Sequence, residues 1–115
     1  MVTSRRFPYV EVQFRVRGLR RQDWAYLDTG FEGFLIVPEA IAASLGNPDL
    51  VSVWELGDGS LTQGAGYLGE VEISGVAQTI AAQVTCLGDE WILGLEVLKH
   101  FQVIFNHGQS VEIRN

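Results

Sequence analysis

The fold of this chain is decided by the stretch WAYLDTGFEGFLIVP, residues 24–38. Its apolar spacing predicts a strand over 24–27, then a loop with two glycines over 29–33, then a short strand over 34–37. The second strand contains no polar residue, which indicates burial on both faces. Asp28 stands where the first strand ends. A carboxylate is costly to bury alone, so we expect Asp28 to be hydrogen-bonded or paired.

Strand patterns continue on both sides of this stretch, separated by glycine-rich turns. Pro38 opens a short helix that ends at Gly46, because proline is favoured at the first helical position and glycine after the last. A second short helix is predicted over 95–101. The sequence therefore predicts one all-β, mainly antiparallel domain over residues 1–115 with one or two short helices, whose other strands lie at 9–16, 50–56, 61–73, 76–87, 91–93, 102–105 and 110–113.

Two strand segments carry more specific signals. Gly64, Gly66 and Gly69 interrupt the strand over 61–73, and glycine inside a strand indicates a bend, a bulge or a close backbone approach. The segment 57–60, Gly-Asp-Gly-Ser, is a strong turn signal between two extended runs. We therefore expect a hairpin whose tip holds Asp58, Gly59 and Ser60.

The charge of the chain is unevenly distributed. The net charge is −6, yet residues 1–21 hold six arginines and one acid. Gly18 and the arginines after it are expected to form a turn, so that Arg15, Arg17, Arg20 and Arg21 form a small basic patch. The patch is either a solvated surface or a contact for an acidic partner, including a second subunit. The acidic remainder makes the chain a poor candidate for binding nucleic acid.

Location and membrane contact are judged from the apolar runs and the single cysteine. No apolar run approaches the ~20 residues that a membrane helix needs, and none has signal-peptide length. Cys86, the only cysteine, lies in an apolar run and suits a reducing compartment. We expect a cytoplasmic protein without a membrane partner.

Other chemical constellations are weak. Cys86 with His100 or His107 shows no local motif for a thiol nucleophile. Glu96 and His100 share a helix face, but no third ligand is evident, so neither a metal nor another cofactor is expected. The three tryptophans are best interpreted as core or interface packing, and they are Trp24, Trp54 and Trp91.

The order of these motifs resembles the retropepsin-like aspartic peptidases, single-domain relatives of pepsin that work as homodimers. The residues that carry the resemblance are Tyr26–Gly30 with its Asp-Thr-Gly, Phe34–Pro38, the hairpin around 57–60, and Trp91–Leu95 with its following helix. The resemblance spans residues 8–113 and implies a half-barrel that dimerises. Each of two copies would then contribute one Asp28, and the N-terminal strand and residues 110–114 would lie at the interface.

The resemblance also implies roles for single residues. Asp28 is the expected catalytic residue, and Thr29 is expected to interlock the two active-site loops. The carbonyl of Gly30 would face the substrate backbone. The remaining expected roles are support of the Asp28 loop by Ile92, Leu93 and Gly94, and substrate contact by Phe31, Glu32, Asp58, Gly59 and Ser60, the last three at the tip of a flap.

One departure from the family pattern concerns Phe31, where the family often has alanine. A large ring at this position is expected to reshape the pocket nearest the cleaved bond. The expected function is an aspartic endopeptidase acting on peptides or proteins. The alternative is a non-catalytic peptide-binding or dimerisation module that kept the fold.

Overall fold

The computed structural model describes all residues, 1–115, and is built mainly from strands. The expected all-β fold class is confirmed. A seven-stranded sheet has the order β2-β3-β8-β4-β7-β6-β5, and a separate three-stranded sheet has the order β1-β10-β9. The strands are β1 Val2–Ser4, β2 Tyr9–Val16, β3 Leu19–Leu27, β4 Leu35–Val37, β5 Leu50–Glu55, β6 Leu61–Ile73, β7 Thr79–Cys86, β8 Ile92–Leu93, β9 Gln102–Asn106 and β10 Ser110–Arg114.

The helices are short, as expected. Pro38 precedes the 3₁₀ turn η1, Glu39–Ile41, which runs into α1, Ala42–Leu45, and the chain leaves α1 at Gly46 with a positive φ of 81°. The second helix, α2, covers only Leu95–Leu98. Its last expected residues instead form a turn that leads into β9.

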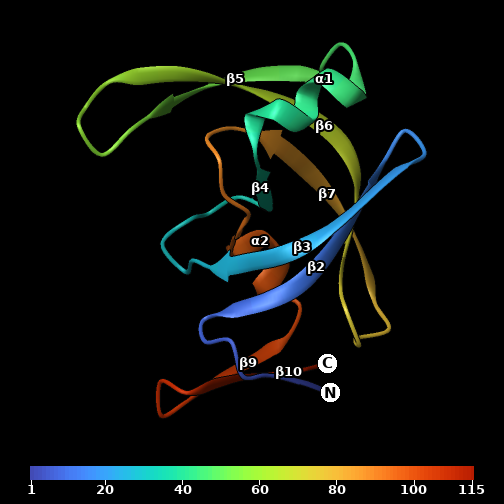
Figure 1. The fold of residues 1–115 in the computed structure, drawn as a ribbon, viewed down its shortest axis with the longest axis vertical. Helices are drawn as coiled ribbons and strands as arrows, with labels where there is room; N and C mark the ends of the chain where they lie inside the picture. Colours follow the sequence, from blue (N-terminus) through green and yellow to red (C-terminus); the bar gives the residue numbers. More distant parts are fainter.

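The large sheet closes on itself, because β2 pairs with β6 as well as with β3 (Figure 1). Alternate residues of β2 point into the resulting core, with Val12 and Phe14 fully buried. Phe14 packs on Trp91 with ring centroids 5.5 Å apart. Burial of one such side chain stabilises the fold by about 1.5–3 kcal/mol.

Strand β8 positions the functional region. It lies parallel to β3, pairing Leu27 with Leu93, and antiparallel to β4, pairing Leu35 with Leu93. All three leucines are buried. The ends of two strands that are far apart in sequence therefore meet in the core directly beside Asp28.

The second sheet gathers both termini. Strand β1, which the pattern over 1–8 does not predict, pairs with β10, and β10 pairs with β9 (Figure 1). Phe7 contacts Phe105 of β9 edge to face, with centroids 5.6 Å apart. The termini thus form one layer below the main sheet.

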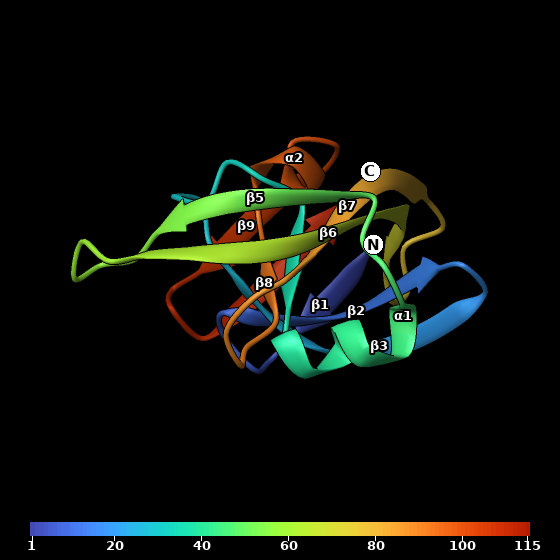
Figure 2. The same ribbon diagram turned by 90° about the horizontal axis from the view of Figure 1, so that it is seen from above.

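The hairpin of β5 and β6 projects from the body as a long arm, residues 50–66 (Figures 1 and 2). One face of β5 is open to solvent, with Val51 57% and Val53 64% exposed. The opposite face carries Ser52 and Trp54, which are half-buried. Strand β6 is continuous through its glycines, which correspond to close approaches and not to breaks.

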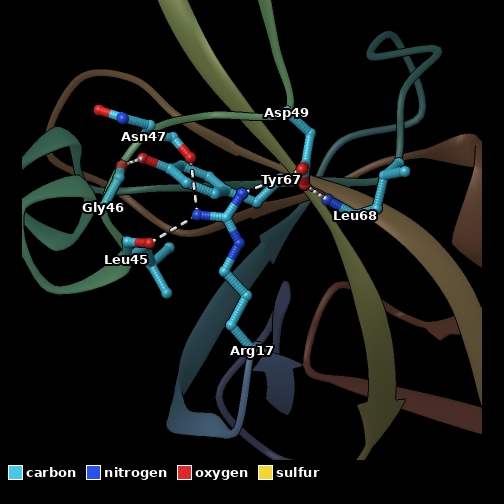
Figure 3. A network of polar contacts seen from close by, with 7 residues as sticks. All are labelled: Arg17, Leu45, Gly46, Asn47, Asp49, Tyr67 and Leu68. Atoms are coloured by element: carbon cyan, nitrogen blue, oxygen red, sulfur yellow. Dashed lines mark hydrogen bonds and ion pairs between the residues drawn. The ribbon is translucent and has the colours of Figure 1, made fainter.

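The arginines of the expected basic patch are all exposed, but Arg17 also binds the root of this arm (Figure 3). The turn consists of Arg17 and Gly18, and Arg20 and Arg21 belong to β3. The Arg17 guanidinium donates to the carbonyls of Leu45 and Asn47 at 2.8 and 2.6 Å and to the Asp49 carboxylate at 2.9 Å.

The same guanidinium lies 5.1 Å from the ring centroid of Tyr67, whose hydroxyl donates to the Gly46 carbonyl at 2.6 Å. Asp49 in turn accepts the Leu68 N–H at 2.8 Å. The network therefore ties the loop before β5 to the middle of β6 and fixes the direction in which the arm leaves the body.

Replacing Arg17 with alanine is expected to loosen this root. The Leu68 amide should exchange with solvent faster in Arg17→Ala, measured by hydrogen–deuterium exchange. The pKa of Asp49 lies below its ordinary value because of the Leu68 N–H and then Arg17. The ionised Asp49 carboxylate therefore stabilises the fold at any pH above its ordinary pKa. This stabilisation is lost as the pH falls through the lowered pKa of the folded state.

The control is Arg21→Ala, since Arg21 is exposed and takes part in none of the ion pairs. It removes the same charge from the neighbouring strand. Equal Leu68 exchange in both variants would show that the root of the arm does not depend on Arg17.

Candidate active site

Asp28 is the first residue beyond β3, and hydrogen bonds of its own backbone fix its position. Its N–H donates to the Leu93 carbonyl at 3.0 Å, and its own carbonyl accepts the Phe31 N–H at 3.2 Å. The preceding Leu27 is buried, whereas Thr29 and Gly30 are exposed. A rigid strand thus delivers a half-buried carboxylate to an exposed loop.

The carboxylate is oriented by the loop itself. The Gly30 N–H donates to Asp28 Oδ1 at 2.8 Å. A Cβ at residue 30 would stand 3.2 Å from the same oxygen, which is tighter than most side-chain contacts. Glycine at position 30 therefore lets the backbone approach Oδ1 of the carboxylate closely. The second oxygen, Oδ2, accepts no hydrogen bond within the loop.

The loop after Asp28 is clamped by the start of α2. The Leu95 N–H donates to the Phe31 carbonyl at 2.9 Å, and the Glu96 N–H donates to the Gly33 carbonyl at 3.0 Å. Gly94 allows this approach, because a Cβ there would lie 2.3 Å from the Gly33 oxygen. The residues 92–94 therefore lie directly behind the Asp28 loop.

The ring of Phe31 lies over two glycines. A Cβ at Gly33 would stand 2.4 Å from its Cζ, and one at Gly94 would stand 2.5 Å from its Cδ2. The Phe31 ring also contacts the ring of Trp54 in the arm, with ring centroids 5.7 Å apart. Phe31 thus fills the space that side chains at 33 and 94 would take, and it connects the loop to the arm.

A cavity of about 180 Å³ opens beside these rings. Its polar groups come from β5, β7, α2 and the loop after Asp28. Trp54 Nε1 is buried and has no hydrogen-bond acceptor. The lining residues are Phe31, Glu32, Gly33, Phe34, Trp54, Gln83, Thr85 and Glu96.

Comparison with known proteins agrees at the level of the fold. No protein-family model and no curated protein matches the sequence. Among solved structures, a retropepsin-like aspartic protease from Rickettsia conorii matches with a TM-score of 0.64 at 15% identity, over 97% of this chain and 88% of that one. The simian foamy virus protease matches with a TM-score of 0.50 at 21% identity, over 75% of this chain and 86% of that one.

This chain has a retropepsin-like fold. The structural similarity confirms the fold that the sequence motifs predict. A shared fold at such low sequence identity does not establish an activity.

In this retropepsin-like chain, Asp58, Gly59 and Ser60 do form the tip of the arm. Asp58 Oδ1 accepts from the Ser60 hydroxyl and N–H at 2.6 and 2.9 Å, and these bonds lower the pKa of Asp58 below its ordinary value. Gly59 takes a positive φ of 85°. The contacts of the tip are local, and the arm reaches the Asp28 loop through Trp54.

The lining residues that were not expected at the site include four outside the Asp28 loop: Trp54, Gln83, Thr85 and Glu96. Gln83 Nε2 donates to Thr85 Oγ1 at 3.3 Å, and Glu96 is paired with Lys99 at 2.7 Å. The strand alternation that places Ser52 and Trp54 on one face of β5 is the only signal in the sequence for Trp54.

The only cysteine of the chain, Cys86, lies buried in the core. Burial raises the pKa of the Cys86 thiol to about 11, so it stays protonated at neutral pH and is a poor nucleophile. No group of three His, Cys, Asp or Glu side chains is placed to hold a metal ion. Neither helix has the length and apolar character needed to cross a membrane.

Proposed function

We propose that the protein is an aspartic endopeptidase whose catalytic centre is formed by two copies of the chain, each contributing Asp28. The observation that carries the proposal is the Asp28 carboxylate, fixed by Gly30 and Leu93 on an exposed loop of a retropepsin-like fold. A single chain supplies one such carboxylate. A twofold axis beside the loop brings two identical surfaces together, which is the usual geometry of a homodimer.

The chemistry follows from two carboxyl groups held about 3 Å apart. They cannot both ionise, so the pair shares one proton. The ionised member takes a proton from a bound water, whose oxygen attacks the peptide carbonyl carbon. The protonated member gives its proton to the carbonyl oxygen, and the amine then leaves with a proton as the C–N bond breaks.

The arm serves as the flap in this proposal. Its position over the Asp28 loop, with Trp54 against Phe31, would let it cover an extended peptide and exclude water. Main-chain hydrogen bonds to the arm and to Gly30 would hold the peptide extended. Phe31 and Glu32 would contact substrate side chains, and Asp58, Gly59 and Ser60 would close over the substrate.

A peptide-library digestion tests the function. We expect cleavage by the wild-type chain and its loss with a hydroxyl-bearing mimic of the tetrahedral transition state. Titration should need one inhibitor molecule for two chains. Cleavage that the mimic leaves untouched would contradict the proposal, and peptides that bind without being cleaved would favour a peptide-binding module.

Replacing Thr29 with alanine is expected to weaken the dimer. Thr29 is exposed on the loop that would face its copy, and its hydroxyl is the group expected to cross the axis. A hydrogen bond of this kind contributes about 0.5–1.5 kcal/mol, and the substitution removes one from each copy, so the dissociation constant should rise roughly 5- to 150-fold. Sedimentation at low concentration measures this, with Thr79→Ala, at an exposed position of β7 outside the expected interface strands, as the control. An unchanged constant would remove the interlocking role.

A further inference from the structure

The cavity beside Asp28 combines aromatic walls with an acidic rim. Phe31 and Trp54 form one side, while Glu32 and Glu96 supply two carboxylates. Its volume of about 180 Å³ far exceeds the roughly 10–15 Å³ that one water molecule needs. A long substrate side chain therefore fits, and faces of aromatic rings attract a cation.

The charges within the cavity are not balanced. Glu96 is paired with Lys99, with Nζ 2.7 Å from Oε2. Glu32 takes part in none of the four ion pairs of the chain. The lining therefore carries one carboxylate in excess, which favours a positive group and repels a negative one.

The indole N–H of Trp54 is closed to solvent and lies against Gly64 of β6. It has no partner, and it lies 2.9 Å from the place a Cβ of Gly64 would occupy. A buried donor without an acceptor is costly. The choice of occupant therefore depends on the aromatic walls of the cavity and on the carboxylate of Glu32.

We propose that this cavity selects a Lys or Arg side chain of the peptide substrate and that Glu32 is the residue that determines this specificity. The inference rests on the proposed peptidase function, because it presumes a peptide in the cleft. The aliphatic part of the side chain would lie along Phe31 and Trp54. Its cationic end would reach Glu32 at the rim.

A matched substrate series tests this by cleavage. Each position around the cleaved bond of one library substrate is changed in turn to lysine, to norleucine and to glutamate. At one position kcat/KM should be about 5-fold higher for lysine than for norleucine, and lowest for glutamate. Glu32→Gln should bring the lysine-to-norleucine ratio near one, and Glu32→Lys should invert the preference for lysine over glutamate.

The control is Glu39→Gln, which removes the same charge from an exposed residue of η1 that lines no cavity. It should leave the ratio as in wild type. A wild-type ratio of one at every position, or a ratio that Glu32→Gln leaves intact, would overturn the inference while the peptidase function stands.

Binding measured without turnover separates the two proposals. The Asp28→Asn chain, labelled with ¹⁵N, is titrated with acetyl-Ala-Ala-Lys-Ala-Ala-amide and with its norleucine counterpart. The Trp54 indole resonance, assigned with Trp54→Phe, should shift with about 5-fold tighter binding of the lysine peptide, and Glu32→Gln should remove the difference. Equal binding overturns the inference. Selective binding without any cleavage in wild type would sustain it and refute the peptidase.

Discussion

Replacing Gly94 with alanine should destabilise the protein more than any other single methyl group added near the site. The added Cβ would stand 2.3 Å from the Gly33 oxygen and 2.8 Å from the Phe31 oxygen, both backbone atoms. Overpacking commonly costs about 1–3 kcal/mol, and fixed backbone belongs at the upper end. We expect a loss of about 3 kcal/mol and a melting temperature lower by about 10–15 °C, measured by circular dichroism.

The matched control is Gly57→Ala. A Cβ there meets no atom within 4 Å, and the residue has no positive φ. Its melting temperature should stay within a degree or two of wild type. Equal melting temperatures for Gly94→Ala and Gly57→Ala would show that the Asp28 loop can move to accept the methyl group and that α2 does not hold it in place.

A second substitution separates the two contacts of the added methyl group. Phe31→Ala removes the ring that would stand 2.5 Å away but leaves the Gly33 oxygen in place. Combined with Gly94→Ala it should restore only part of the lost stability. Full restoration would mean that the ring, and not the backbone, sets the limit.

Most strands of the fold could be predicted from the sequence, because the patterns that indicate them are local. Alternation over Tyr9–Val16 predicts β2 with its observed bounds, and the apolar run ending at Val37 predicts the buried β4. The Gly-Asp-Gly-Ser turn places the tip of the arm. Each of these signals depends on neighbours in the chain, and so does the position of Asp28 at a strand end.

The site was less predictable because its parts meet across the sheet. Trp54 reaches Phe31 only because β5 of the arm passes beside the Asp28 loop, and Thr85 joins them through the pairing of β7 with β6. Arg17 looked like surface charge because the carbonyls it binds belong to another segment. The pairing of two copies and the cytoplasmic location stay predictions.

Exchanging Asp28 for asparagine is expected to abolish cleavage while leaving the fold intact. Asparagine keeps the size of the side chain and the oxygen that accepts the Gly30 N–H at 2.8 Å. It cannot hold or release the shared proton. General acid–base groups contribute about 10²–10⁴-fold, so we expect kcat/KM to fall at least about 10³-fold. Replacing Asp23, an exposed acid on the strand that leads to Asp28, with asparagine should retain wild-type activity.

Mixing the two chains tests whether the centre is shared. If each dimer needs two intact Asp28 residues, equal amounts of wild-type and Asp28→Asn chain leave about one quarter of the dimers active after exchange. Adding the inactive chain should therefore reduce the activity of a fixed amount of wild-type chain by about half. Asp23→Asn added in the same amount should cause no such loss. Activity that ignores the added Asp28→Asn chain would assign a complete catalytic centre to one chain.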